Sequence, residues 1–270
     1  MNDTIRLERH GHVAVLTLHR PETLNSLSLE AIRALLGQLR ALADDASVRA
    51  LVITGAGRAF CAGWQLDGEI PGLPDESPGV RQAHLMEAYF NPVIQALHDL
   101  PIPTVAAVNG VCAGAGVSIA LAADLVIASD TAGFLLTFAP KLGLVPDLGA
   151  SWKLPRLIGW ARAQAVTMLG ERIGAETAER WGMIWRQVPA ESLPGEAMAL
   201  ALRLADAPPG VCREVRRVFD AAQLNGLAAQ MDHERHRQRE LLDKPSFNEG
   251  VRAFQEKRAP RFHPIPTTGE

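Results

Sequence analysis

The chain has 270 residues, of which 47% are hydrophobic and 21% charged, values typical of a globular protein with one large domain or a domain and an appendage. The formal net charge is −3, and the basic residues are scattered along the chain, which excludes the basic stripe of a nucleic-acid-binding protein. The cysteines Cys61, Cys112 and Cys212 are odd in number and lack metal-ligand spacing. We therefore expect a reduced, cytoplasmic protein without a bound metal.

The N-terminal half alternates predicted strands and helices. Residues 12–19 and 49–54 are apolar and rich in β-branched side chains, which is typical of strands buried on both faces. Between them, Ser28 is placed to cap a helix with a regular apolar stripe. The pattern continues with a proline-rich loop at 69–78, a helix carrying Tyr89 and Phe90, a strand at 103–108, a short helix at 114–123 and a strand at 125–128. This alternation predicts βαβ units and a mainly parallel sheet.

Residues 105–123 are almost wholly apolar and about as long as a membrane-spanning helix. The stretch contains Asn109 and several glycines and runs directly into Asp124. These features favour a buried strand followed by a buried helix. Residues 1–10 carry charges of both signs and no apolar run, so no signal peptide is expected either.

The C-terminal part is predicted to be helical, with no strand after Gly149. Helical patterns occupy residues 161–169, 175–181, 194–205 and 210–222, and two or three more helices are expected between 224 and 258. A turn is expected at Lys244-Pro245-Ser246. We therefore expect an α/β core over residues 1–205 and a helical C-terminal region over residues 206–270.

Two glycine-rich segments follow predicted strands. The first, RAFCAGWQLD (58–67), is preceded by Gly-Ala-Gly but lacks the third glycine and the helix of a dinucleotide fingerprint, so a Rossmann site is rejected. A plain strand-to-loop turn remains open. The second, NGVCAGAGVS (109–118), lies where a strand passes into a helix. Its free N–H groups can bind a developing negative charge, or its small residues can serve only tight packing.

The third segment, KLGLVPDLG (141–149), places Asp147 after a proline. An aspartate there can cap a helix or sit in a solvated turn. Alternatively, it can face a cleft, where desolvation raises the carboxyl pKa and suits the group to proton transfer. The residues alone leave both interpretations open.

These segments together resemble the crotonase, or enoyl-CoA hydratase/isomerase, superfamily, and the resemblance covers almost the whole chain. The matching blocks are RPETLNSL (20–27), VRALVITGAGRAFCAG (48–63), PTVAAVNGVCAGAG (103–116), KLGLVPDLGASWKLPRLIG (141–159), AERWGMIW (178–185) and FQEKRAPRF (254–262). The resemblance implies a ββα-spiral core and a helical C-terminal trimerisation region. It also implies an acyl-CoA thioester substrate, with coenzyme A entering as part of that substrate and no bound cofactor.

The resemblance assigns roles to particular positions. Two backbone amides, those of Trp64 and Ala115, would form an oxyanion hole for the thioester carbonyl. The turn Trp64-Gln65-Leu66-Asp67 would contact coenzyme A, with Gln65 replacing an acid often found there. Lys257 would reach the coenzyme A phosphates, in some relatives from a neighbouring subunit. Relatives form trimers that often pair as hexamers.

Departures from the family pattern favour isomerisation over hydration. The two glutamates with which hydratases hold water fall on Ser118 and Ala139, and adding water across a double bond needs such groups. What remains is Asp147, in the Leu-Val-Pro-Asp context of relatives that isomerise. The similarity is strongest to isomerases of ring-1,2-epoxyphenylacetyl-CoA. We therefore expect an acyl-CoA isomerase that forms a thioester enolate and uses Asp147 as its acid/base, on such an epoxide or on a 3-enoyl-CoA.

Three alternatives stay open. The first is an enoyl-CoA hydratase that recruits Asp67 or Glu69. The second is a dehalogenase-like enzyme with Asp147 as nucleophile, helped by His84 or His98. The third is a non-catalytic acyl-CoA-binding protein.

Overall fold

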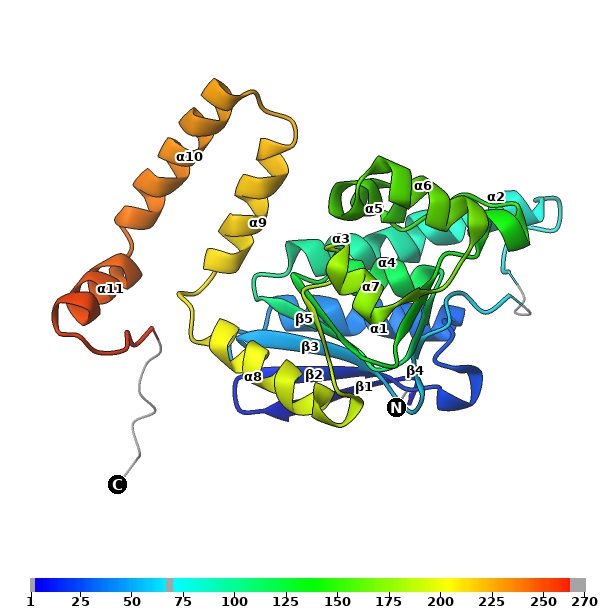
Figure 1. Cartoon of the computed structure of the whole chain (residues 1–270), viewed down its shortest axis with the longest axis horizontal. Coiled ribbons are helices and arrows are strands. Elements are labelled where there is room, and N and C mark those ends of the chain that lie inside the picture. The colour runs from blue at the N-terminus through cyan, green and yellow to red at the C-terminus, as the bar shows by residue number, and fades with distance from the viewer. Residues whose placement is uncertain (1–2, 67–69, 263–270) are drawn as a thin grey trace.

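The computed structural model describes residues 3–66 and 70–262. Figure 1 shows an α/β core and a helical arm that extends from it. The strands are β1 (Ile5–His10), β2 (Val13–Leu18), β3 (Ala50–Gly55), β4 (Ala59–Cys61), β5 (Thr104–Val108), β6 (Val111–Ala113), β7 (Leu125–Ser129), β8 (Gly133–Leu135), β9 (Ile173–Gly174) and β10 (Arg186–Val188).

The helices are α1 (Leu29–Ala43), α2 (Pro78–Leu85), α3 (Asn91–Asp99), α4 (Ala115–Ala122), α5 (Ala150–Ile158), α6 (Trp160–Leu169), α7 (Ala175–Arg180), α8 (Leu193–Ala205), α9 (Val211–Ala222), α10 (Leu227–Leu242) and α11 (Pro245–Gln255). Short 3₁₀ turns occur at η1 (Pro21–Thr23) and η4 (Ala190–Ser192), and π-helical turns at η2 (Met86–Phe90) and η3 (Phe138–Leu142). Isolated π turns are frequent near functional sites.

The strands form two sheets. The larger has the order β1-β2-β3-β5-β7-β10, in which only the β1–β2 pair is antiparallel. The smaller has the order β4-β6-β8-β9, in which β4, β6 and β8 are parallel. Each successive pair, β3–β4, β5–β6 and β7–β8, gives one strand to each sheet before a helical segment follows. This is the ββα spiral that the family resemblance implies.

The larger sheet is covered on both faces. Along β3, Val52 packs with the helix α8 side of the sheet, whereas Leu51 and Ile53 pack with α1, α3 and α4. This period-two alternation is typical of a strand between two apolar layers. Helix α1 starts where expected, because the Ser28 hydroxyl accepts a hydrogen bond of 3.2 Å from the Ala31 amide.

The predicted end of the strands at Gly149 is wrong, because β9 and β10 follow it and β10 pairs with β7. Strands of two or three residues are too short to carry a periodic pattern. The edge strand β1 was also not predicted. The apolar residues 105–123 form a strand and a helix, β5 and α4, as predicted, with the short strand β6 between them that was not predicted. Over residues 3–66 and 70–262, no helix is long and apolar enough to span a membrane.

Helices α9, α10 and α11 form the arm, and only α9 lies against the core in Figure 1. Arg216 of α9 anchors it: its guanidinium donates to the carbonyl oxygens of Leu100 and Ile102 at 2.6 and 3.0 Å and pairs with Asp124 at 3.1 Å. Nearby, His98 Nε2 lies 2.8 Å from Asp220 Oδ2. The arm is therefore joined to the core mainly through charged and polar groups.

Candidate active site

The three candidate residues Trp64, Ala115 and Asp147 each follow a strand of the smaller sheet. Strand β4 leads to Trp64, β6 leads to Ala115, and β8 leads through η3 towards Asp147. Because β4, β6 and β8 are neighbours and parallel, their carboxyl ends lie at one edge. Ligand sites of open α/β sheets form at such edges. The topology thus brings three distant parts of the sequence to one place.

The peptide N–H of Trp64 is oriented by its neighbours. Leu27 N donates to Gly63 O at 2.7 Å and Gln65 N donates to Leu27 O at 3.0 Å. In an extended chain successive peptide groups point to alternate sides, so the Trp64 N–H points away from Leu27. Gly63 has φ +96°, and a Cβ there would lie 3.4 Å from Ala115 N. This glycine brings the two predicted oxyanion segments into contact.

A network that sequence reasoning missed supports this turn. Asn25 is buried with φ +57°, and its side-chain amide donates to Ala56 O at 2.9 Å and Ala59 O at 2.7 Å. Arg20 Nη1 donates to Gln65 Oε1 at 2.9 Å. The carboxamide at 65, which replaces an acid, therefore accepts from an arginine that also belongs to the RPETLNSL block. Arg20 and Asn25 both belong to that block, but an asparagine a few residues after a proline indicates only a turn.

Ala115 is the first residue of α4, so its N–H belongs to the amides that have no partner within the helix. It does not adopt positive φ, which is the condition under which alanine is tolerated at this position. The next residue, Gly116, is required by packing, because a Cβ there would lie 2.4 Å from the Cys61 carbonyl oxygen. The Trp64 ring packs edge-on against Phe90 of η2, with centroids 4.9 Å apart. These contacts fix the Trp64 side chain against η2 and α4 against β4.

Asp147 lies half-buried just before α5. Burial raises the pKa of its carboxyl group, an effect partly offset by a hydrogen bond from its own backbone amide. Its Oδ1 is buried without a hydrogen-bond partner among the described residues. The N-cap of α5 is Gly149, and no side chain caps that helix, so Asp147 is not a helix cap. The direction of the pKa change agrees with the cleft-facing interpretation.

The backbone around Asp147 is held from two sides. Its carbonyl oxygen accepts hydrogen bonds from Ser118 Oγ at 3.1 Å and from Ala150 N at 2.9 Å. Ser118 is buried on α4, one helical turn beyond Ala115, and Ala139 is half-buried in η3. The positions of the hydratase glutamates therefore hold a hydroxyl and a methyl group inside the fold.

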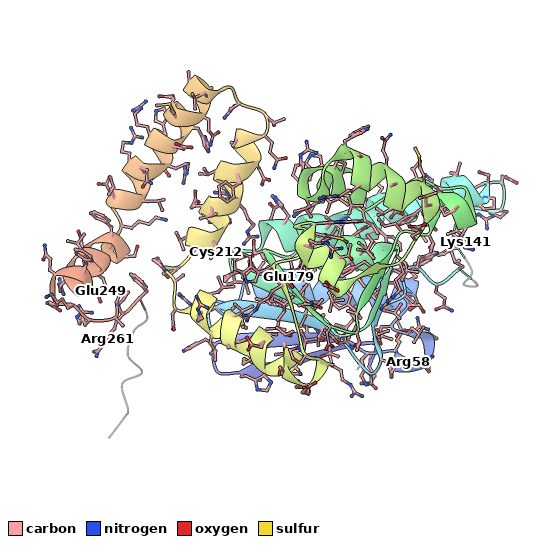
Figure 2. The ribbon with its side chains drawn as sticks, viewed as in Figure 1. Arg58, Lys141, Glu179, Cys212, Glu249 and Arg261 are labelled. Atoms are coloured by element: carbon pink, nitrogen blue, oxygen red, sulfur yellow. The ribbon has the colours of Figure 1, made fainter. Side chains whose placement is uncertain are left out.

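The other predicted contact residues are spread out. Gln65 is half-buried and Leu66 is 68% exposed, whereas Asp67 lies outside the described residues, as does Glu69 of the hydratase alternative. Lys257 is exposed, with φ +55°, in the segment after α11. Figure 2 labels Glu249 and Arg261 on either side of this segment, at the opposite end of the molecule from Arg58 and Lys141. One chain therefore does not bring Lys257 to its own Trp64 and Ala115.

The histidines of the dehalogenase-like alternative are occupied elsewhere. His98 is bonded to Asp220, and His84 Nδ1 lies 3.4 Å from Glu76 Oε1 on an exposed face of α2. Neither is joined to Asp147 by a hydrogen bond. Among the residues that the structure describes, no group of three or more His, Cys, Asp or Glu side chains is arranged to hold a metal ion.

The spiral fold with a strand-end site defines a crotonase-like protein, and comparison with known proteins gives the family. The enoyl-CoA hydratase/isomerase family model matches residues 8–264. The chain is 42% identical to the probable enoyl-CoA hydratase of Rhodobacter capsulatus over 260 residues, covering 96% of this chain and 97% of that protein. It is also 42% identical to the 1,2-epoxyphenylacetyl-CoA isomerase of Escherichia coli over 250 residues, covering 93% and 94%.

Among solved structures, a putative enoyl-CoA hydratase from Streptomyces coelicolor superimposes with a TM-score of 0.88 at 34% identity, over 96% of this chain and 94% of that one. The chain therefore belongs to the enoyl-CoA hydratase/isomerase family and is a crotonase-family enzyme. The two equally similar relatives are named for different reactions, so the reaction has to be inferred from the site.

Proposed function

We propose that the protein is an acyl-CoA isomerase that forms a thioester enolate and moves a proton with Asp147. The observation that carries this proposal is the buried, unpartnered Oδ1 of Asp147, in a carboxyl group whose pKa is raised by burial. A general base needs an ionisable group with a free oxygen and a pKa shifted towards the working pH. The lack of a carboxylate at positions 118 and 139 leaves this group to act alone.

The reaction follows from the arrangement of these groups. The thioester carbonyl oxygen accepts hydrogen bonds from the N–H groups of Trp64 and Ala115. Asp147 takes a proton from the carbon next to the carbonyl, and the electron pair of that C–H bond moves onto the oxygen to give the enolate. With a 3-enoyl thioester, the electrons shift along the chain and the proton returns to a carbon two positions further on, which gives the 2-enoyl thioester. With an epoxide on the neighbouring carbon, the electrons form a double bond to that carbon, its C–O bond breaks, and the epoxide oxygen takes the proton. Removing one oxyanion donor typically costs about a hundredfold to a thousandfold in rate.

The identity to the Escherichia coli 1,2-epoxyphenylacetyl-CoA isomerase supports an epoxide of an aromatic acyl group as one substrate. The equally similar Rhodobacter capsulatus relative, named a probable hydratase, supports the alternative reaction. Hydration requires one group to activate water and another to protonate carbon. Ser118 and Ala139 offer neither, which favours isomerisation.

The proposal includes a homotrimer or a homohexamer in the cytoplasm. Large apolar side chains of the arm are exposed in a single chain, including Leu224 at 89% and Phe254 at 86%. Exposed apolar patches mark interaction surfaces. In such an assembly the turn from Trp64 to Asp67 would hold coenzyme A, and Lys257 would reach the phosphates of a coenzyme A bound to another subunit.

The test is to incubate the enzyme in deuterated water with phenylacetyl-CoA, a 3-enoyl-CoA and crotonyl-CoA, and to follow the products by mass spectrometry and ultraviolet absorbance. We expect deuterium next to the carbonyl and conversion of the 3-enoyl to the 2-enoyl thioester. Asp147→Asn should lower both rates by about a hundredfold to ten-thousandfold. Asp44→Asn, an exposed carboxylate at the end of α1, is the matched control.

Three results would contradict the proposal. Wild-type turnover in Asp147→Asn would remove the aspartate from the chemistry. Hydration of crotonyl-CoA without isomerisation would make the protein a hydratase. Tight binding of all three thioesters without any reaction would make it an acyl-CoA-binding protein.

A further inference from the structure

Ser118 joins two parts of the candidate site. Its side chain is 3% exposed, and its hydroxyl donates a hydrogen bond of 3.1 Å to the backbone carbonyl of Asp147. It lies on α4, whose eight residues are all buried and whose first residue is Ala115. Residues three apart on a helix share a face. One short, buried helix therefore carries the second oxyanion amide and also contacts the loop that bears the proton-transfer group.

The segment that leads into Asp147 is exposed, whereas Leu148, directly after it, packs in the core. Leading into Asp147, Leu144 and Val145 are 55% and 79% exposed. Directly after it, Leu148 has φ +51°, a left-handed conformation that is unfavourable for a residue with a branched side chain. Such conformations persist only where surrounding contacts hold them. The Asp147 carbonyl accepts from Ala150 N at the start of α5 and from the Ser118 hydroxyl, which comes from a different and wholly buried helix.

We propose that Ser118 is a positioning residue for Asp147, an inference that rests on the proposed isomerase function. Its hydroxyl fixes the place of the carboxylate relative to the Ala115 amide, and thus relative to the enolate oxygen and the carbon that loses its proton. Displacing a reacting group by about 1 Å can cost about a hundredfold in rate.

The chemistry of the side chain at position 118 also bears on whether the enzyme isomerises or hydrates its substrate. An ionised carboxylate at 118 has no proton to donate to the Asp147 carbonyl. It would also place a second negative charge beside Asp147, and like charges oppose the ionisation of a carboxyl group. A glutamate at 118, as in the hydratases, is therefore incompatible with this way of holding Asp147. A hydroxyl donates the hydrogen bond without adding charge.

The experiment compares Ser118→Ala with Ser118→Thr, which restores a hydroxyl. For Ser118→Ala we expect kcat for 3-enoyl-CoA isomerisation to fall about tenfold to a hundredfold while KM changes less than about threefold, because the hydrogen bond affects the base and not the coenzyme A contacts. Deuterium exchange next to the carbonyl should fall in parallel. Ser118→Thr should recover most of the rate.

The pH profile separates positioning from a merely structural role. If the released loop exposes Asp147 to water, its pKa falls towards the ordinary value and the acid limb of kcat/KM moves to lower pH. Loss of folded protein alone would lower the amplitude and leave the limb in place. Ser129→Ala is the control: Ser129 is 1% exposed and its hydroxyl lies 2.7 Å from Thr131 Oγ1, in the turn after β7. This variant should lose stability but keep kcat and the acid limb.

The outcomes distinguish the two proposals. If Asp147→Asn is inactive but Ser118→Ala keeps both the wild-type kcat and the acid limb, the positioning role is wrong and the proposed function stands. If Ser118→Ala folds too poorly to assay, failure of Ser118→Thr to reach at least a third of the wild-type kcat would also overturn the inference. Full activity of Asp147→Asn would refute the proposed function itself.

Discussion

The candidate site and the helical arm satisfy opposite packing conditions. At the candidate site, backbones approach so closely that a single added carbon has no room: a Cβ on Gly116 would lie 2.4 Å from Cys61 O. On the arm, large apolar side chains such as Leu224 and Phe254 face solvent. The candidate oxyanion segments and Asp147 are thus held by contacts within one chain, whereas the arm exposes large apolar side chains in a single chain. The arrangement of the proposed catalytic groups can be described from one chain. The coenzyme A contact that is proposed for Lys257 requires a second chain.

The contact between the core and the arm differs from both regions, because it depends on charged and polar groups. The core is held by apolar burial, but α9 is attached by Arg216, whose side chain is 13% exposed and bridges Asp124 and the carbonyl oxygens beyond α3. Charge-assisted hydrogen bonds are directional. They can therefore fix the position of α9 relative to the core without burying α9 in the apolar core.

The largest effect is expected where packing is tightest. Gly116→Ala should destabilise the protein by about 1–3 kcal/mol, because an overpacked core has to move backbone atoms. It should also lower activity by about a hundredfold, since α4 carries the Ala115 amide and would shift away from Trp64. Chemical denaturation and isomerase assays measure the two effects.

The matched substitution is Gly37→Ala on α1, where an added Cβ meets nothing within 4 Å. It should stabilise by about 0.5–1 kcal/mol with unchanged activity, because alanine is the better helix former. If Gly116→Ala were as harmless as Gly37→Ala, the close approach of α4 to β4 would not be a feature of the protein in solution.

An intermediate effect is expected on the arm. Phe254→Asp should leave the unfolding of the core unchanged but weaken assembly at least about tenfold, since burying one large apolar side chain contributes about 1.5–3 kcal/mol. Light scattering over a dilution series measures the mass. Gln255→Asp, which adds the same charge at an exposed neighbouring position, is the control. A wild-type protein that scatters as a monomer at micromolar concentration would refute the assembly proposal.

Periodicity predicts those parts of the fold that are long enough to show a pattern. The stripe of α1 and the apolar runs of β3 and β5 were visible: α1 begins directly after the predicted cap, and both strands lie within a residue of their expected bounds. Strands as short as β9 and β10 have no period to detect. The helix α5 was not predicted either, because Pro155 lies inside it.

The sequence indicated candidate site residues but not the contacts that hold them. Glycines at strand ends and the family resemblance indicated Trp64, Ala115 and Asp147. The hydrogen bond from Ser118 to the Asp147 carbonyl joins residues far apart in the sequence, and no local pattern signals such a bond. Asn25 likewise contacts Ala56 and Ala59 across the fold. The place of Lys257 depends on an assembly that a single chain does not contain.

The smallest expected effect is a change in how stability depends on pH, caused by the ionisation of Asp147. Burial raises the carboxyl pKa in the folded protein above the value in the unfolded chain. Between these two values the folded state binds more protons than the unfolded state, so stability falls as pH rises through the interval and stays lower above it. At pH 7 the protein therefore carries the cost of a half-buried carboxylate, which a neutral asparagine does not.

Asp147→Asn should accordingly have a higher Tm than the wild type at pH 7, and the difference should shrink as pH falls and the wild-type carboxyl becomes protonated. Scanning calorimetry from pH 7 to about pH 4 measures it, with Ser129→Ala as a variant that removes no ionisable group. Protonation of Asp147 should have opposite effects on stability and on catalysis. It raises the stability of the folded wild type, but kcat/KM should fall where Asp147 becomes protonated. A Tm difference independent of pH would show that Asp147 has an ordinary pKa. The ionised carboxylate that performs the proposed chemistry is thus the form that the folded core favours least, which is the trade-off expected of an enzyme site.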